Sequence, residues 1–389
     1  MNKKILSVML LIFLLSPLFS EDLRTKFIKG NIADKTAAVK EASGEESLWL
    51  SRTAVDFVLT YKELIGSDKE IDGLAVAAIL SYPNELLKDC SNNQKKIFTN
   101  QMNDLFNKFK DSSIVQIAVI SKVLLTDKFM DFSSFTVLLN NYISAYNVKV
   151  IDAGVMKSII NALGIIGDND SFIILYNFWK NSNYDSYTSE LESSLVALSP
   201  RSVTEILKII AYDVTDFNCV YKLIEKNTGI SKNSLCEIAE NVLSESILYI
   251  KDSSKINPDV ISTQMNALKI LNDNKWTKSS KVVAYYFEES KRLYDDDLLA
   301  EKQFTTIIES LSNISPTDSV ASLILYLEEL NKQKEKQSAV SNAVVLSVIK
   351  TLGAIGDKSA FDSLLSVTYL RYSESILSAA REALSGLRW

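Results

Sequence analysis

The chain has 389 residues, of which 47% are hydrophobic and 23% are charged, a balance typical of a folded globular protein and not of a disordered or multi-span membrane protein. Only 11 glycines and 5 prolines are present, which disfavours folds that need frequent tight turns and favours long helices. Histidine is absent, which excludes Ser-His and Cys-His catalytic pairs and histidine-ligated zinc sites.

The first 20 residues have the layout of a secretory signal peptide. Two lysines precede an apolar run from Ile5 to Leu15, and Pro17 follows it ahead of the acidic Glu21. The alternative is a retained N-terminal anchor, but the run is shorter than the roughly 20 residues that a membrane-spanning helix needs. We therefore expect residues 1–20 to be cleaved and the mature protein to be exported, to the periplasm or outside the cell.

The protein is acidic. It has 42 lysines and arginines against 48 aspartates and glutamates, a formal net charge of −6, and signal cleavage would remove two of the lysines. Because a negatively charged protein repels phosphate backbones, no nucleic-acid partner is expected. No later segment has 18 uninterrupted apolar residues, so we expect no stable membrane insertion once the signal has been removed.

A short motif recurs along the chain. Residues 161–168 (Asn-Ala-Leu-Gly-Ile-Ile-Gly-Asp) return as residues 351–357 (Thr-Leu-Gly-Ala-Ile-Gly-Asp), and a weaker copy (Asn-Ala-Leu-Lys-Ile-Leu-Asn-Asp) occupies residues 266–273. Leucines at comparable positions recur every 32 to 44 residues, apart from one double interval of 70: Leu80, Leu124, Leu163, Leu198, Leu268, Leu311, Leu352 and Leu384. This period predicts a stacked array of about eight or nine helical hairpins.

The motif predicts a junction between two helices. The segment that leads into it carries an apolar stripe at helical spacing: Val155, Ile159, Ala162, Leu163 and Ile166. Gly167 is expected to close the first helix in the left-handed conformation, and Asp168 is expected to cap the second. Gly164 lies within the first helix, where glycine costs about 1 kcal/mol relative to alanine, so a close approach of a neighbouring backbone is expected there.

Serine-proline pairs predict similar junctions elsewhere. At Ser199-Pro200 and Ser315-Pro316 the serine is expected to cap a helix that begins with the proline, and Ser315 and Asp318 have the spacing of a capping box. The four prolines after the signal can all be placed at helix starts, so none is expected inside a helix: Pro83, Pro200, Pro258 and Pro316.

The last hairpin is predicted at Ser359 to Leu370 and Ser375 to Leu387. The expected inner faces are Ala360, Phe361, Leu364, Leu365 and Thr368 in the first helix and Ile376, Ala379, Ala380, Ala383, Leu384 and Leu387 in the second. Neither helix can bury its stripe alone, so the hairpin needs a neighbour. Because no polar capping helix follows in the sequence, we expect this C-terminal repeat to pair with a second copy or with a partner protein.

The pattern Ala-Leu-Gly-x-Ile-Gly-Asp, followed by an amphipathic helix, a turn and an alanine-rich helix, resembles the HEAT repeat, in particular the short HEAT units of phycobilisome lyases. Residues 155–198 and 345–387 carry the resemblance best, and it extends loosely over most of 46–389. It implies an all-α, right-handed superhelix of antiparallel helix pairs, from about residue 46 after an N-terminal segment at 21–45. Such families are mostly protein-binding scaffolds, with a minority of enzymes that attach bilins or repair bases.

Few residues point to chemistry. Asp295, Asp296 and Asp297 form the densest carboxylate cluster, but adjacent positions cannot all face one ion from a helix, and the glycine and glutamate of an EF-hand loop are missing. We interpret the cluster as a solvated loop or helix cap. The sequence has no nucleophile elbow and no phosphate-binding loop. No catalytic, cofactor-binding or metal-binding residue is predicted, and no cofactor.

The three cysteines, Cys90, Cys219 and Cys236, match no metal-ligand spacing. We expect them to be small buried side chains. A disulfide between Cys219 and Cys236 is the alternative in an oxidising compartment.

Aromatic residues gather near the predicted helix ends and turns: Tyr142, Tyr146, Tyr176, Trp179, Tyr184, Tyr187, Tyr285, Tyr286, Tyr369 and Tyr372. Tyrosine and tryptophan are favoured at protein interfaces, and the alternative is that these rings fill a core lined by small residues. The basic stretch from Lys332 to Gln337 is interpreted as an exposed turn within a repeat.

The sequence therefore favours an exported, non-enzymatic scaffold of the bacterial cell envelope that binds a partner protein on its solenoid surface. The alternative is a modifying enzyme, of the HEAT-lyase kind or another carboxylate-dependent type, that acts on a partner protein. A carrier of a small apolar ligand between the helix layers is a third possibility.

Overall fold

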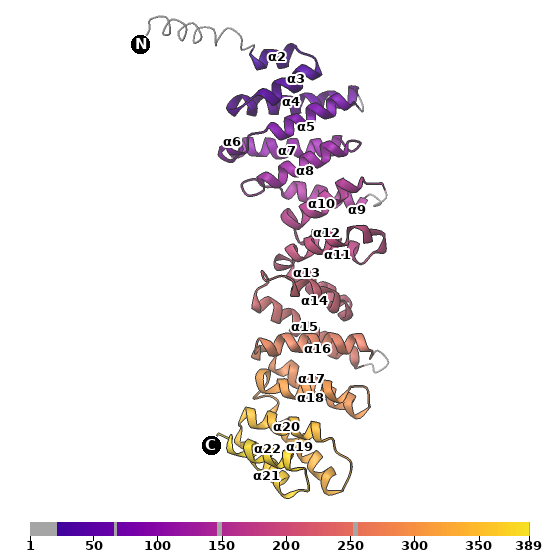
Figure 1. The fold of residues 1–389 in the computed structure, drawn as a ribbon, viewed down its shortest axis with the longest axis vertical. Coiled ribbons are helices and arrows are strands. Elements are labelled where there is room, and N and C mark those ends of the chain that lie inside the picture. The colour runs from indigo at the N-terminus through magenta and orange to yellow at the C-terminus, as the bar shows by residue number, and fades with distance from the viewer. Residues whose placement is uncertain (1–21, 66–67, 146–149, 252–255, 389) are drawn as a thin grey trace, which may run out of the picture. The chain divides into compact units, whose positions relative to one another are not determined.

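The computed structural model describes residues 22–65, 68–145, 150–251 and 256–388, so the expected signal peptide at 1–20 lies outside the described residues. Within these ranges the protein is built of α-helices and short 3-10 turns, and no named strand occurs. The predicted all-α class is confirmed. The chain forms two compact units, Met1–Arg201 and Ser202–Trp389, and the helices of each unit stack in chain order (Figure 1).

The N-terminal unit has two layers of helices. One layer contains α3 (Ile32–Glu41), α5 (Lys69–Ser81), α8 (Ser113–Thr126), α10 (Ala153–Ile166) and α12 (Thr188–Leu198). The other contains α4 (Gly44–Ile65), α7 (Asn92–Lys108), α9 (Ser133–Ala145) and α11 (Asn169–Trp179). Two short helices, α2 (Leu23–Lys29) and α6 (Asn84–Asp89), pack against α3 and α4 respectively. Each helix contacts its neighbours in its own layer and a partner in the other, the solenoid-like pairing that the repeat predicts.

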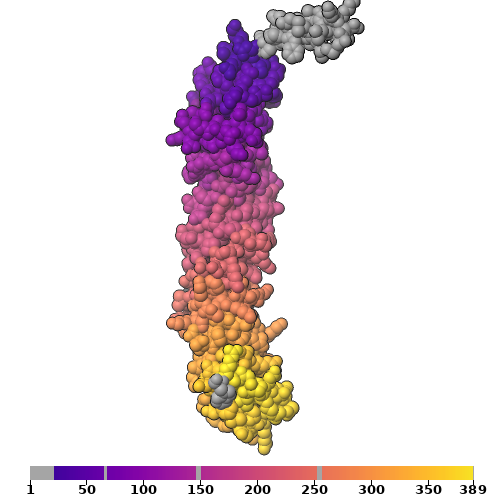
Figure 2. All heavy atoms as spheres, turned by 90° about the vertical axis from the view of Figure 1, so that its left-hand side faces the viewer, coloured from indigo at the N-terminus to yellow at the C-terminus, as the bar shows by residue number. Residues whose placement is uncertain are grey.

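The C-terminal unit repeats this arrangement. One layer contains α14 (Phe217–Glu225), α16 (Pro258–Asp273), α18 (Glu301–Ile314), α20 (Asn342–Ile355) and α22 (Glu374–Ser385). The other contains α13 (Val203–Tyr212), α15 (Lys232–Ile250), α17 (Ser280–Asp295), α19 (Val320–Glu335) and α21 (Phe361–Tyr369). In Figure 2 the colours of each unit follow one another in bands, because each hairpin contacts mainly the hairpins next to it.

The described part of the N-terminal segment, residues 22–45, takes part in this stacking. It contains α2 and α3, and α3 packs on both α4 and α5. Lys35 of α3 donates to the carbonyl oxygen of Phe27 at the end of α2, which ties the two helices together. Residues 22–45 therefore contribute a helix pair to the N-terminal unit.

The repeated motif forms the expected junction, with one correction. Val155, Ile159, Ala162 and Leu163 of the predicted stripe are buried and Ile166 is half-buried. Asp168 caps α11 by accepting a hydrogen bond from the Ser171 N–H at 2.9 Å. Gly167, however, has φ −62° and ψ 162°, so the left-handed prediction is wrong there. Glycine is required because a Cβ would stand 2.1 Å from the Leu163 carbonyl oxygen. The second copy behaves as expected, because Gly356 ends α20 with φ 72°.

The capping role predicted for the two serine-proline pairs is wrong. Ser199 and Ser315 are the C-cap residues of the preceding helices, α12 and α18. The next α-helices begin only at Val203 and Val320. The preceding helices continue to the serine, and a short turn that contains the proline follows. Asp318 instead accepts a hydrogen bond from the Ser280 hydroxyl, so no capping box forms. Pro258 is the first residue of α16, as expected, and no proline lies further inside a described α-helix.

Three further expectations differ in detail from the structure. Leu80 is exposed while Ile79 is buried, so the buried position expected for this recurring leucine is taken by the residue before it. The stretch from Lys332 is helical as far as Glu335, and only its end forms the expected turn. In α21 the residues Ser363, Leu364 and Val367 are buried, and Phe361, Leu365 and Thr368 are half-buried. A 3-10 turn at Lys358–Ala360 precedes α21 and, with three residues per turn, shifts its face.

Cys90, Cys219 and Cys236 are free thiols, so the alternative disulfide is not formed. Cys236 is buried, as expected, whereas Cys90 and Cys219 are partly exposed.

Candidate functional site

A hollow of the C-terminal unit lies between α16 and α18, which are neighbours in one layer. Two adjoining pockets of about 480 and 550 Å³ share Met265, Asn266 and Thr306. We call their combined lining the α16–α18 groove. The weaker copy of the motif lies in α16, and the marker Leu311 lies in α18. The apolar stripe of each helix packs inward and leaves polar residues facing outward along the groove.

Asparagine side chains dominate one end of the α16–α18 groove. Asn313 donates from Nδ2 to Oδ1 of Asn272 at 3.0 Å, and both residues line the groove. Asn266 donates in the same way to Asn218 of α14 at 3.0 Å. An amide side chain has two donor hydrogens and an acceptor oxygen, so each of these bonds leaves further donor and acceptor capacity at the groove. A peptide backbone offers the complementary N–H and carbonyl groups.

The remainder of the α16–α18 groove combines apolar and charged groups. Met265 and Leu298 contribute apolar surface, and Lys269 and Glu309 place opposite charges on its two helices. Methionine adapts its shape to irregular partners, which suits a binding surface. This lining can hold an extended chain by its backbone while accepting an apolar side chain.

The carboxylates singled out in the sequence do not act as one cluster. Asp295 ends α17, where burial raises the pKa of its carboxyl and the nearby Glu329 raises it further. Glu329 of α19 is ion-paired with Lys291 at 2.5 Å. Asp296 lies 3.5 Å from Arg292, and Asp297 has φ 58° at the helix end. The three aspartates thus lie at the end of α17, in agreement with the helix-cap interpretation. Asp295 also interacts electrostatically with Lys291 and Glu329, which link α17 to α19.

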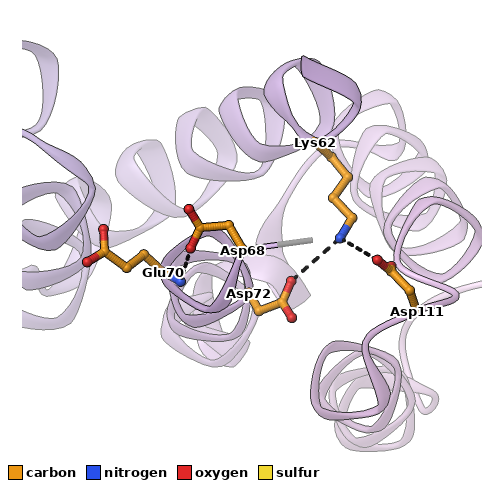
Figure 3. Close-up of polar contacts among 5 residues, drawn as sticks. All are labelled: Lys62, Asp68, Glu70, Asp72 and Asp111. Carbon is orange, nitrogen blue, oxygen red and sulfur yellow. Dashed lines mark hydrogen bonds and ion pairs between the residues drawn. The ribbon is translucent and has the colours of Figure 1, made fainter. Parts of the chain in front are cut away.

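A second charged cluster, not anticipated from the sequence, lies in the N-terminal unit (Figure 3). The ammonium of Lys62 on α4 is 3.1 Å from Asp111 and 3.8 Å from Asp72 of α5. Lys62 is almost completely buried, and its Nζ lies 4.7 Å from the centre of the Phe109 ring. Beside the cluster, Asp68 caps α5. Asp111 is 49 positions from Lys62 in the sequence, so no spacing rule reveals this cluster.

A pocket of about 340 Å³ lies where α8 and α10 end, and three carboxylates line it: Asp127, Asp131 and Asp168. Hydrogen bonds from Ser133 hold the pKa of Asp131 below its usual value. Burial acts to raise the pKa of Asp168, but hydrogen bonds from Ser171 outweigh it and the pKa is lowered. Carboxyls with lowered pKa values are ionised at neutral pH, so they are poorly suited to act as general acids. We call this hollow the aspartate pocket.

Cationic side chains satisfy carbonyl groups at helix ends in the N-terminal unit. Lys35 bonds carbonyls at the end of α2, Lys122 bonds the Tyr82 carbonyl after α5, and Arg201 bonds two carbonyls at the end of α10. Burial lowers the pKa of all three groups, that of Lys122 to about 8. Lys122 is 2% exposed and its two acceptors are protein groups, so it serves the junction between hairpins.

Most of the aromatic residues noted in the sequence belong to the core. Tyr142, Tyr176, Tyr184, Tyr187, Tyr286 and Tyr372 are buried, and Trp179 is half-buried. Tyr285 and Tyr369 are exposed, and Tyr146 lies outside the described residues. Core filling therefore explains most of this set.

In the part of the chain that the structure describes, no three acidic or cysteine side chains are placed to hold a metal ion. None of the helices described there combines the length and apolar character needed to cross a bilayer. Comparison with protein-family models, with curated proteins and with solved structures found no match for this chain.

Proposed function

We propose that this protein is an exported, non-enzymatic scaffold of the cell envelope and that it holds a partner protein by an extended segment bound in the α16–α18 groove. The observation that carries the proposal is the Asn272–Asn313 pair, in which two amides from neighbouring hairpins hydrogen-bond to each other and line the same groove. The hairpin stacking and the repeated motif support a HEAT-type array as the frame for this surface.

The amide chemistry favours a protein ligand of mixed sequence. Backbone hydrogen bonds hold an extended peptide whatever its side chains are, and pockets beside them select particular residues. Lys269 and Glu309 add charges of both signs, and Met265 adds an adaptable apolar contact. A partner segment with an apolar residue between polar neighbours fits this lining.

Site-specific photo-crosslinking in the native host tests the proposal. A photoreactive amino acid at Lys269, within the groove, is expected to give a defined adduct with one envelope protein. The matched control is Lys281, an exposed lysine on α17 in the other layer, which is expected to give none. Equal labelling from both positions, or no adduct from position 269, would count against binding in this groove.

The enzymatic alternative requires a carboxyl that carries a proton near neutral pH and faces a cavity. Asp295 has a raised pKa, but it belongs to the ion cluster with Lys291 and Glu329. Asp131 and Asp168 line a pocket, but their pKa values are lowered. The binding function is therefore the better supported of the two.

A further inference from the structure

The outward face of α8 in the N-terminal unit is unusually apolar, and one exposed apolar residue near the end of each neighbouring helix, α5 and α10, adds to it. Leu80, Leu125 and Ile165, near the ends of the three helices, are 56%, 61% and 51% exposed. In α8 the exposed or half-exposed positions are Ser113, Ile114, Ile117, Ser121, Leu124 and Leu125, with no charged residue among them. The solvent face of a surface helix normally carries charged and polar residues.

The helix α8 lies between α5 and α10 and packs on both. An added Cβ at Gly154 of α10 would lie 3.4 Å from the Ile117 Cδ1, so α8 and α10 meet closely on this face. Lys122 joins α8 to the end of α5 through the Tyr82 carbonyl. We call the set Leu80, Ile114, Ile117, Leu124, Leu125 and Ile165 the apolar face. Contiguous exposed apolar surface of this kind marks interaction sites in soluble proteins.

The aspartate pocket adjoins the apolar face, because Ile165 lines that pocket together with Asp127. The helices α8 and α10 both end there, and the C-terminal end of a helix carries partial negative charge. Arg201 donates to the Gly164 and Ile165 carbonyls at this end, and its charge acts on Asp168, but it does not line the pocket, so one cation stands against three carboxylates. The local field of the pocket therefore favours a cation.

We propose that the apolar face and the aspartate pocket together bind a second protein segment, one that is amphipathic and basic. Its apolar side chains would cover Leu125 and Ile165, and a lysine or arginine next to them would enter the aspartate pocket. The charge of the pocket selects this occupant over an acidic or purely apolar segment. The surface lies in the other unit from the α16–α18 groove and does not depend on it.

Fluorescence anisotropy with two designed peptides tests this site on the mature protein. One is a labelled amphipathic helix of leucine and lysine, about 15 residues long, and the other replaces each lysine with glutamate. The lysine peptide is expected to bind at least tenfold more tightly, and the variant L125S/I165S is expected to lose that binding tenfold or more. Asp127→Asn should weaken binding and flatten its salt dependence.

Tyr212→Ser provides the matched control, since Tyr212 is an exposed apolar residue of the other unit. This variant should bind the lysine peptide as the wild type does. Equal affinity for both peptides, unchanged binding by L125S/I165S, or no binding by the folded wild type would each overturn the proposal. Because Leu125 and Ile165 are exposed, circular dichroism is expected to show an unaltered fold for the variant.

Discussion

Gly353 of α20 lies directly against Ala383 of α22, so that a Cβ at position 353 would stand 2.8 Å from the Cβ of Ala383. The first copy of the motif makes the same contact, because a Cβ at Gly164 would stand 2.7 Å from the Ser194 Oγ on α12. Glycine inside a helix is unfavourable on its own. Here it allows neighbouring helices of one layer to pack closely, so its cost is offset by contact between hairpins.

Gly353→Ala is therefore expected to destabilise the protein by about 2 kcal/mol, the cost of overpacking a close contact. Gly73→Ala in α5 is the matched control, because a Cβ there meets nothing within 4 Å. That change should stabilise the helix by up to about 1 kcal/mol. Urea unfolding measures both effects. The added Cβ would also stand 2.9 Å from the Cα of Ala383, so the double variant G353A/A383G should recover only part of the loss. A loss for G353A no larger than the change for G73A would contradict the contact.

In the described part of the chain, three helices are followed by non-glycine residues in the left-handed conformation: Lys275, Asp297 and Gln337. At Gln337 the N–H of the next residue, Ser338, donates to the Gln333 carbonyl, the bond that closes a Schellman motif. Gln337→Gly should raise the free energy of unfolding by about 1 kcal/mol, since it relieves steric strain. Gln337→Val should lower it. A denaturation midpoint for Gln337→Gly below that for Gln337→Val would show that the backbone is not strained there.

The buried Lys62 should matter more than an exposed lysine in a similar ion pair. Lys62→Met leaves the partly buried Asp72 carboxylate without its cation, and we expect a loss of about 3 kcal/mol. Lys108→Met removes the exposed pair with Glu63, whose atoms are 3.2 Å apart, and should cost less than about 1 kcal/mol. Thermal unfolding of both variants provides the comparison. Equal losses of stability in the two variants would contradict the burial of the Lys62 ion pairs shown in Figure 3.

Lys122 should make stability depend on pH. Its folded-state pKa is about 8 and its ordinary value is 10.5, so between these values the unfolded chain binds more protons. The folded state therefore gains stability as the pH rises through this window. The free energy of unfolding of the wild type should rise by about 2 kcal/mol relative to that of Lys122→Met between pH 7.5 and 9.5. A constant difference would show that the ammonium is not desolvated.

Local patterns account for much of the fold. The apolar stripe of α10 and the Asp168 cap can be predicted because each depends on neighbours within one helix turn or one junction. The close approach at Gly164 can be predicted because glycine inside a helix is unfavourable by itself, although its partner Ser194 cannot be named from the sequence. The different conformations of Gly167 and Gly356 could not be predicted in this way, because both glycines follow isoleucine and precede aspartate. The carbonyl of Gly356 accepts a hydrogen bond from the Arg388 N–H, a distant contact that the first copy lacks.

The candidate site was beyond the reach of sequence patterns for a related reason. Asn272 and Asn313 are 41 positions apart and meet only because α16 and α18 are neighbours in one layer. Asparagine at a helix end is also common for capping alone, so neither residue stands out. Knowledge of the repeat gives the spacing at which such pairs can occur, but the outward residues of each repeat differ.

The affinity of the crosslinked partner for a groove variant tests the central claim most directly. With that partner purified, N272A/N313A is expected to raise the Kd at least tenfold while N241A, which alters an exposed asparagine on α15, leaves it unchanged. A Kd for N272A/N313A equal to that of the wild type would contradict binding through the amide pair of the α16–α18 groove.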